Sequence, residues 1–141
     1  MKTLKTITAA LLIAFSFSAF AADGTAKEKR EMNYALKTYI EAVNEGKIGT
    51  LSEVLDREVK FTTTRGEQII SHNKSEMMNS LKGSENVIQN CETSFNVVEA
   101  TPSFSVVKVI SKYKGFSKVN YLNLANTGKG WKITSVSTSF I

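Results

Sequence analysis

The last part of the chain, residues 100–141, decides the fold and reads ATPSFSVVKVISKYKGFSKVNYLNLANTGKGWKITSVSTSFI. Apolar and polar residues alternate in it over three runs, which is the period of β-strands. Gly115 and residues 126–130 separate the runs and supply turns. The stretch holds six lysines and contains no Asp and no Glu. We expect three consecutive antiparallel strands that form the main body of one sheet, at 104–113, 116–125 and 131–140.

An amphipathic helix is predicted near the start of the chain. Its apolar side chains recur with helical spacing and form one stripe, which comprises Met32, Ala35, Leu36, Tyr39, Ile40 and Val43. Gly46 is a natural stop for this helix. Residues 50–53, TLSE, follow the pattern of a capping box, in which the Thr and Glu side chains bond free backbone donors. A short second helix is expected here, with an apolar inner side and an end near Asp56.

A hairpin, a third helix and a further strand are predicted next. Val59, Phe61 and Thr63 alternate with polar residues, and the turn Arg65-Gly66 leads to a second short strand at 68–71. A helix of about ten residues is expected to begin after Asn73 and to end at Gly83. Cys91, Thr93, Phe95 and Val97 then line one face of a strand that Pro102 ends. The order α-α-β-β-α-β-β-β-β indicates an α+β fold with three N-terminal helices on one side of an antiparallel sheet.

Four segments carry a resemblance to a known superfamily. They are the helix end Asn44-Glu45-Gly46, the short helix 51–56 that leads into Val59-Lys60-Phe61, the strand 66–72 that runs into a helix, and Gly128–Ile133 before the last strand. The chain resembles the nuclear transport factor 2-like (cystatin-like cone) superfamily, especially its exported bacterial lumazine-binding-like and polyketide-cyclase-like members. The resemblance implies a strongly bent sheet and a conical pocket, lined by the first helix, the third-helix region and the concave face of the sheet.

The beginning of the chain matches a secretory signal peptide. Lys2 and Lys5 precede an uncharged apolar run, and Ala19-Phe20-Ala21 has the small-x-small pattern of a cleavage site. The run is shorter than the about 20 residues that a membrane span needs. We expect cleavage after Ala21 and a periplasmic or secreted protein with one domain, residues 22–141. An N-terminal anchor that is not cleaved is the alternative.

The charge of the expected mature chain is modest and uneven. Loss of Lys2 and Lys5 lowers the formal net charge from +5 to +3. Residues 22–99 carry ten Lys/Arg and thirteen Asp/Glu, or −3, whereas residues 100–141 carry +6. With no recognition motif in the sequence, this charge argues against nucleic-acid binding. Lys108, Lys112 and Lys132 are expected on the solvent side of the sheet, with an anionic partner as the alternative reading.

Cysteine and histidine are too few for a disulfide or a transition-metal site. Cys91 is the only cysteine, so an internal disulfide is excluded. We interpret it as a buried small hydrophobe, with a reactive thiol as the alternative. His72 is the only imidazole, which makes a transition-metal site improbable. We expect no metal and no cofactor.

Acid–base catalysis has few candidate residues. The resemblance implies that isomerase and dehydratase members use a carboxylate base or an Asp-His pair inside the cone. Here the two aspartates, Asp23 and Asp56, lie outside the predicted strands. An isomerase base would therefore come from one of three glutamates, Glu67, Glu92 or Glu99. His72 is the best general acid or base because imidazole titrates near neutrality, with a surface or helix-cap role as the alternative.

Small-molecule binding is the function that we favour. The hypothesis is an exported, non-catalytic protein that binds a small, apolar or aromatic molecule inside the cone. The candidate ligand-binding residues are Tyr39, His72, Tyr113, Tyr121 and Trp131. For each ring, a structural role in the core is the alternative. Two other functions stay open: a hydro-lyase or isomerase that uses His72 with a glutamate, and a structural or accessory subunit that acts through its sheet face.

Both faces of the final strands carry apolar side chains. Val107 and Val109 alternate with Val106 and Ile110 along one strand. Helices can cover only one of the two faces. We therefore expect a homodimer in which a second copy covers the other face.

Overall fold

The structure is a computed structural model and describes residues 31–141, so the predicted signal peptide, residues 1–21, lies outside the described residues. The helices are α1 (Met32–Glu45), α2 (Leu51–Val54) and α3 (Lys74–Lys82). The strands are β1 (Leu55–Arg65), β2 (Gln68–His72), β3 (Glu92–Ala100), β4 (Phe104–Tyr113), β5 (Phe116–Asn126) and β6 (Trp131–Phe140). This order confirms the predicted α+β fold class.

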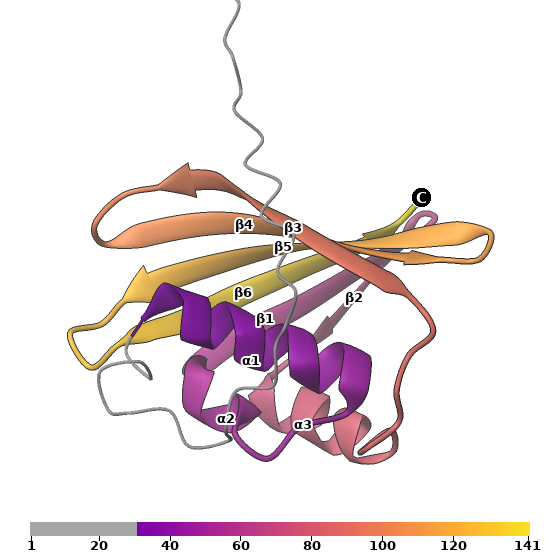
Figure 1. Ribbon diagram of the computed structural model, residues 1–141, viewed down its shortest axis with the longest axis horizontal. Helices are drawn as coiled ribbons and strands as arrows, with labels where there is room; N and C mark the ends of the chain where they lie inside the picture. Colours follow the sequence, from indigo (N-terminus) through magenta and orange to yellow (C-terminus); the bar gives the residue numbers. More distant parts are fainter. Residues whose placement is uncertain (1–30) are drawn as a thin grey trace, which may run out of the picture.

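The six strands form one sheet in the order β2-β1-β6-β5-β4-β3. All neighbouring pairs are antiparallel except β1 and β6, which run parallel. Figure 1 shows the helices on one side of this curved sheet, with α1 lying across its concave face. The sequence predicts four of these strands as a meander but does not predict that β1 joins it beside β6.

The core lies between α1 and the concave face of the sheet. The predicted stripe of α1 faces inward: Ala35, Leu36, Tyr39 and Ile40 are buried there. The sheet supplies Phe61, Val107, Val109, Leu122, Leu124, Ile133 and Val136 to the same cluster. Phe95 and Trp131 pack against it while partly buried. Side chains therefore fill this part of the cone.

Three of the four predicted helix-end signals are confirmed, among them Gly83, which follows the last residue of α3. Gly46 ends α1 in the left-handed conformation with φ +69°, and its N–H donates to the carbonyl of Ala42 at 3.1 Å. Asn73 caps α3, where its side-chain oxygen accepts from the N–H of Glu76 at 2.9 Å. The capping box at Thr50 is wrong, because Thr50 has helical backbone angles and its side chain makes no capping bond. The helix that follows is short, and β1 already begins at Leu55.

The predicted position of Cys91 needs a correction. It precedes β3 instead of lying within the strand, and its side chain is half-buried. Its Sγ lies 3.7 Å from the Oγ1 of Thr93.

Among the described residues, no helix combines the length and the apolar character that crossing a bilayer requires.

The strands are much longer than the helix that covers them. α1 has 14 residues and a length of about 21 Å. β5 has 11 residues and spans about 36 Å. In Figure 1 the β4–β5 turn, the β1–β2 turn and the end of β6 extend past the end of α1. We call this part of the sheet the hairpin end.

Candidate functional site

The concave face changes character along β5, from apolar core to polar and aromatic side chains. Alternate residues of a strand share one face of the sheet. Leu124 and Leu122 are fully buried beneath α1. Asn120 is buried next, Lys118 is half-buried, and Phe116 at the hairpin end is 46 % exposed. The same face therefore serves as core at one end and is open to a ligand at the other.

Three aromatic rings form a continuous ladder across the hairpin end. The rings of Tyr113 and Phe116 stack with centroids 4.8 Å apart and planes within 5°. Phe116 lies 6.3 Å from Phe140 of β6, centroid to centroid. The guanidinium carbon of Arg65 lies 5.5 Å from the centroid of the Phe140 ring. We call Tyr113, Phe116 and Phe140 the aromatic ladder.

A groove of about 590 Å³ opens at this end of the sheet. We call it the hairpin groove, and it is lined by Thr64, Arg65, Gly66, Gly115, Phe116, Phe140 and Ile141. Its volume is within the range of small-molecule sites. All seven lining residues come from strand ends and turns. The first helix and the third-helix region, which the resemblance implies as lining of the conical pocket, do not line this groove.

Lys118 is the cation that lies on the concave face beside the groove. In the strand register it pairs with Ser111 of β4 and Phe140 of β6, so the three side chains share one face. Burial lowers the pKa of its ammonium below the usual value, and the nearby Cys91 opposes this only in part. Within residues 31–141, no Asp or Glu forms an ion pair with Lys118. The ammonium is thus partly desolvated and has no carboxylate partner in that part of the chain.

Asn120 is a fully buried polar side chain that is only half satisfied. Its Oδ1 accepts a hydrogen bond from the Oγ1 of Thr138 at 2.6 Å. Its Nδ2 is the one buried side-chain polar atom without a hydrogen-bond partner in the described part of the chain. Asn120 and Lys118 are two residues apart on β5 and point to the same side. A buried donor without a partner destabilises the fold by about 1–3 kcal/mol, which calls for a functional explanation.

Replacing Lys118 with methionine is expected to stabilise the fold. Lys118→Met removes a half-buried ammonium and keeps an apolar chain of similar length, so the free energy of unfolding at about pH 7 should rise by about 1 kcal/mol. The lowered pKa means that the unfolded wild type binds more protons than the folded one between that pKa and 10.5. Wild-type stability therefore rises with pH across this window, and the advantage of the variant shrinks.

Urea unfolding at neutral and alkaline pH measures this difference. Lys112→Met is the matched control, because Lys112 is exposed on the convex face of β4. It should change the free energy of unfolding by less than about 0.5 kcal/mol. An equal response of the two variants would show that burial of Lys118 is not the cause.

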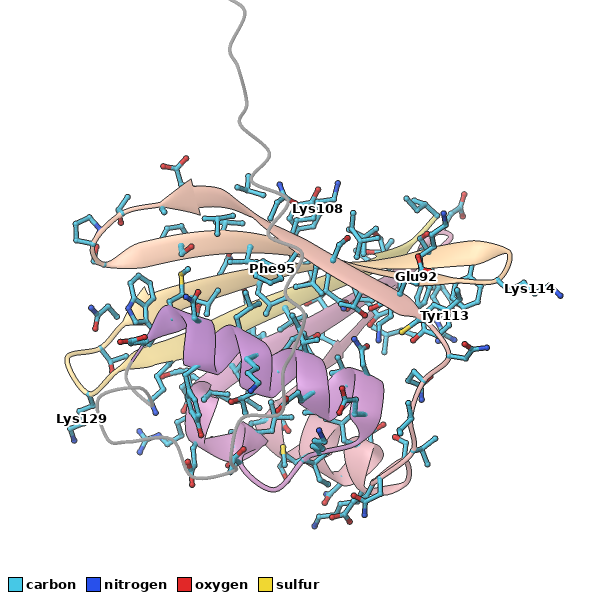
Figure 2. All side chains as sticks on the ribbon, viewed as in Figure 1. Glu92, Phe95, Lys108, Tyr113, Lys114 and Lys129 are labelled. Atoms are coloured by element: carbon cyan, nitrogen blue, oxygen red, sulfur yellow. The ribbon has the colours of Figure 1, made fainter. Side chains whose placement is uncertain are left out.

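Polar contacts close the concave face on the β3–β4 side of Lys118. Asn44, near the end of α1, donates from Nδ2 to Thr93 Oγ1 at 2.6 Å. Ser111 Oγ donates to Asn44 Oδ1 at 3.5 Å. Tyr113 lies beside Cys91, and burial first, then Cys91, raises the pKa of its phenol. Figure 2 shows Tyr113 near the start of β3, with Lys114 projecting beyond it from the turn. The opening that remains lies over β5, β6 and β1.

The predicted ligand-binding rings do not meet at one place. Tyr39 is buried in the core, where burial raises the pKa of its phenol. Tyr121 lies on the convex face, 41 % exposed, with the ammonium of Lys108 5.8 Å from its ring centroid. Trp131 begins β6, about 30 Å from Phe140 at its end. Only Tyr113 belongs to the aromatic ladder, and ligand binding by any of these residues stays a prediction.

His72 lies at the end of β2, away from the hairpin groove. Its Nδ1 is 3.1 Å from Oε2 of Glu76 in the first turn of α3, and both side chains are largely exposed. Its carboxylate neighbour is therefore not one of the three glutamates expected from the sequence. Glu92 pairs with Lys112 on the convex face of the sheet. Within residues 31–141, no group of three or more His, Cys, Asp or Glu side chains is placed to hold a metal ion.

The sequence reading missed Lys118, Asn120 and Arg65. The alternation along β5 would have indicated the first two, because alternate residues of a strand share one face and both lie an even number of residues from the core residue Leu122. Lys108 and Lys112 do lie on the convex face, as predicted. In Figure 2, Lys108 points away from the helices. Lys132 instead donates to the backbone carbonyl of Glu53 in α2.

The sequence also matches a family over nearly its whole length. Residues 27–139 match the family described as "Putative lumazine-binding". This chain belongs to that family. No curated protein matches it significantly. As a lumazine-binding-like chain, it carries the candidate site on strands and turns that lie inside the matched range, apart from Phe140 and Ile141.

Solved structures show how widely this lumazine-binding-like fold occurs. A nuclear transport factor 2-like protein of unknown function from Silicibacter pomeroyi has a TM-score of 0.67 at 11 % identity, covering 84 % of this chain and 100 % of that chain. A cystatin-like fold protein from Burkholderia xenovorans has 0.61 at 16 %, covering 82 % and 92 %. A ketosteroid isomerase-like protein from Erwinia carotovora has 0.58 at 16 %, covering 77 % and 92 %. These likenesses establish the nuclear transport factor 2-like fold and nothing about chemistry.

Proposed function

We propose that this protein is an exported, non-catalytic binding protein that holds a small, partly apolar molecule in the hairpin groove. The aromatic ladder carries the proposal. Phe140 is 40 % exposed and Phe116 is 46 % exposed, although each has a ring neighbour within 7 Å. Exposed rings beside a groove of this size offer a flat apolar surface on which a ligand can stack.

The family description supports a binding role, and the groove lining supports a role without acid–base catalysis. None of the seven lining residues is Asp, Glu or His, the side chains that most often transfer protons. The only imidazole, His72, lies on β2 and forms its contact with α3. The groove is therefore better suited to hold a molecule than to convert it.

Titration with N-phenyl-1-naphthylamine, a neutral apolar dye that fluoresces when it leaves water, tests the proposal. Phe140→Ala removes the ladder ring that lines the groove from β6, so the affinity for the dye should fall about tenfold. Tyr121→Ala, which removes an exposed ring from the convex face, should leave the affinity unchanged. The proposal fails if the dye does not bind, or if both variants weaken its binding equally.

Export is the second part of the proposal. It rests on the basic, apolar and small-residue pattern of residues 1–21. Intact-mass measurement of protein recovered from the exported fraction should give a chain that begins at Ala22. Recovery of the chain with Met1 from the membrane would support the uncleaved anchor instead.

A homodimer through the convex face is also proposed. Val106, Ile110 and Tyr121 lie on this face, away from the helices, and Tyr121 is 41 % exposed. A second copy would cover these side chains. Sedimentation at tens of micromolar should give the mass of a dimer, and a clean monomer would contradict it.

A further inference from the structure

We propose that the hairpin groove selects an organic monoanion, a carboxylate or sulfonate on an apolar body, and that Lys118 and Arg65 bind the anionic group. The inference rests on the proposed function, because it names the chemical class of the ligand for the same groove. The apolar body lies on the aromatic ladder. The negative group lies beside Phe140, which has one cation on each side.

The positions of the cations follow from the strand register. Lys118 of β5 pairs directly with Phe140 of β6. Thr63 of β1 pairs with Thr138 of β6, and Arg65 shares the face of Thr63 because it lies two residues further along. Arg65 also lines the groove, and its guanidinium carbon is 5.5 Å from the ring centroid of Phe140. The two positive groups thus flank the same exposed ring.

Neither cation has a carboxylate partner in the part of the chain that the structure describes. Residues 31–141 place no carboxylate, the C-terminal one of Ile141 included, within ion-pair distance of Lys118 or Arg65. Strands β4, β5 and β6, which supply all three rings of the ladder and Lys118, lie in a stretch that has no Asp and no Glu. A ligand anion is the counter-charge that fits, since a charge-assisted hydrogen bond is about twice as strong as a neutral one.

Asn120 adds an independent observation. Its Nδ2 is buried without a partner on the same face as Lys118, two residues away. An oxygen acceptor that enters beside Lys118 would give this donor a partner and remove a cost already present in the free protein. A ligand oxygen would take the place that an acidic side chain fills in other proteins. This explains why the chain tolerates both the half-buried ammonium of Lys118 and the unpaired amide of Asn120.

The ladder distinguishes an organic anion from a bare oxyanion. The rings of Phe116 and Phe140 line the groove with apolar surface next to the two cations, and Tyr113 stacks on Phe116. Inorganic sulfate or phosphate would leave that surface exposed. An acid with an aromatic or aliphatic body uses both parts of the site.

Two dyes with the same scaffold test the inference. 8-Anilinonaphthalene-1-sulfonate differs from N-phenyl-1-naphthylamine only by its sulfonate. Wild-type protein is expected to bind the sulfonate at least about tenfold more tightly than the neutral dye, as one charge-assisted contact predicts. Lys118→Gln should lower the ratio and leave only the part that is due to Arg65. Arg65→Gln should lower the ratio in part, and Lys112→Gln on the convex face should keep it.

The outcomes separate this inference from the function on which it rests. Equal affinities of the two dyes for wild type, or an unchanged ratio in Lys118→Gln, would overturn the inference that the ligand is an anion. Binding of the neutral dye would still support the proposal that the groove holds a small molecule. Binding of neither dye would overturn both. Inorganic sulfate that competes as well as 1-naphthalenesulfonate would overturn the assignment to an organic anion. A circular-dichroism spectrum that matches the wild type shows that each variant is folded.

Discussion

Leu122→Ala is expected to lower the free energy of unfolding by about 3 kcal/mol, because it removes a large side chain from the centre of the core. Leu122 is 0 % exposed and lies between Val107 of β4 and Val136 of β6 in the strand register. All three side chains pack beneath α1, so the deletion leaves a cavity that neighbouring strands cannot close. Urea unfolding followed by circular dichroism measures the loss.

Ile69→Ala provides the control for this prediction. Ile69 is of similar size but lies on the edge strand β2 and is 71 % exposed. Its truncation should change the free energy of unfolding by less than about 0.5 kcal/mol. Comparable losses for the two variants would contradict the placement of the core between α1 and the centre of the sheet.

Gly46→Ala is expected to lower the free energy of unfolding by about 3 kcal/mol for two reasons that add. The residue adopts φ +69°, a conformation that side chains with a Cβ disfavour. A Cβ at this position would also lie 2.4 Å from the backbone N of Asn86 and 2.5 Å from the backbone O of Ser84. Because both are backbone atoms, the segment after α3 must move away from the end of α1.

Gly66→Ala separates the two causes. Gly66 adopts φ +59° in the β1–β2 turn, but a Cβ there meets nothing within 4 Å. It should therefore lower the free energy of unfolding by only about 1 kcal/mol, the part due to the backbone conformation. If Gly46→Ala were no more destabilising than Gly66→Ala, the close packing of residues 84–87 on α1 would be wrong.

Local patterns predicted the order of elements well, because each depends on a few neighbouring residues. The stripe of α1, its stop at Gly46, the cap at Asn73 and the three final strands all follow from spacing that the structure retains. The capping box at Thr50 failed because the chain leaves α2 for β1 after only one turn. The parallel pairing of β1 with β6 joins segments far apart in the sequence, which no local pattern reveals.

The candidate site escaped prediction for a physical reason. Lysines on strands usually face solvent. The residue type alone does not distinguish Lys118 from Lys108 and Lys112. Lys118 points inward because it lies on the same face of β5 as Leu122. It is partly exposed because α1 is too short to cover that end of the strand. Only the comparison of helix and strand lengths in three dimensions shows that one face is core beneath α1 and groove beyond it.

The central claim is that a small molecule binds at the hairpin end of the concave face. Backbone amide chemical shifts measured with and without N-phenyl-1-naphthylamine test it most directly. The largest changes are expected at Gly66, Gly115 and Phe140, with none at Trp131 or Tyr121. Changes centred on Trp131, or on Tyr121 of the convex face, would contradict it.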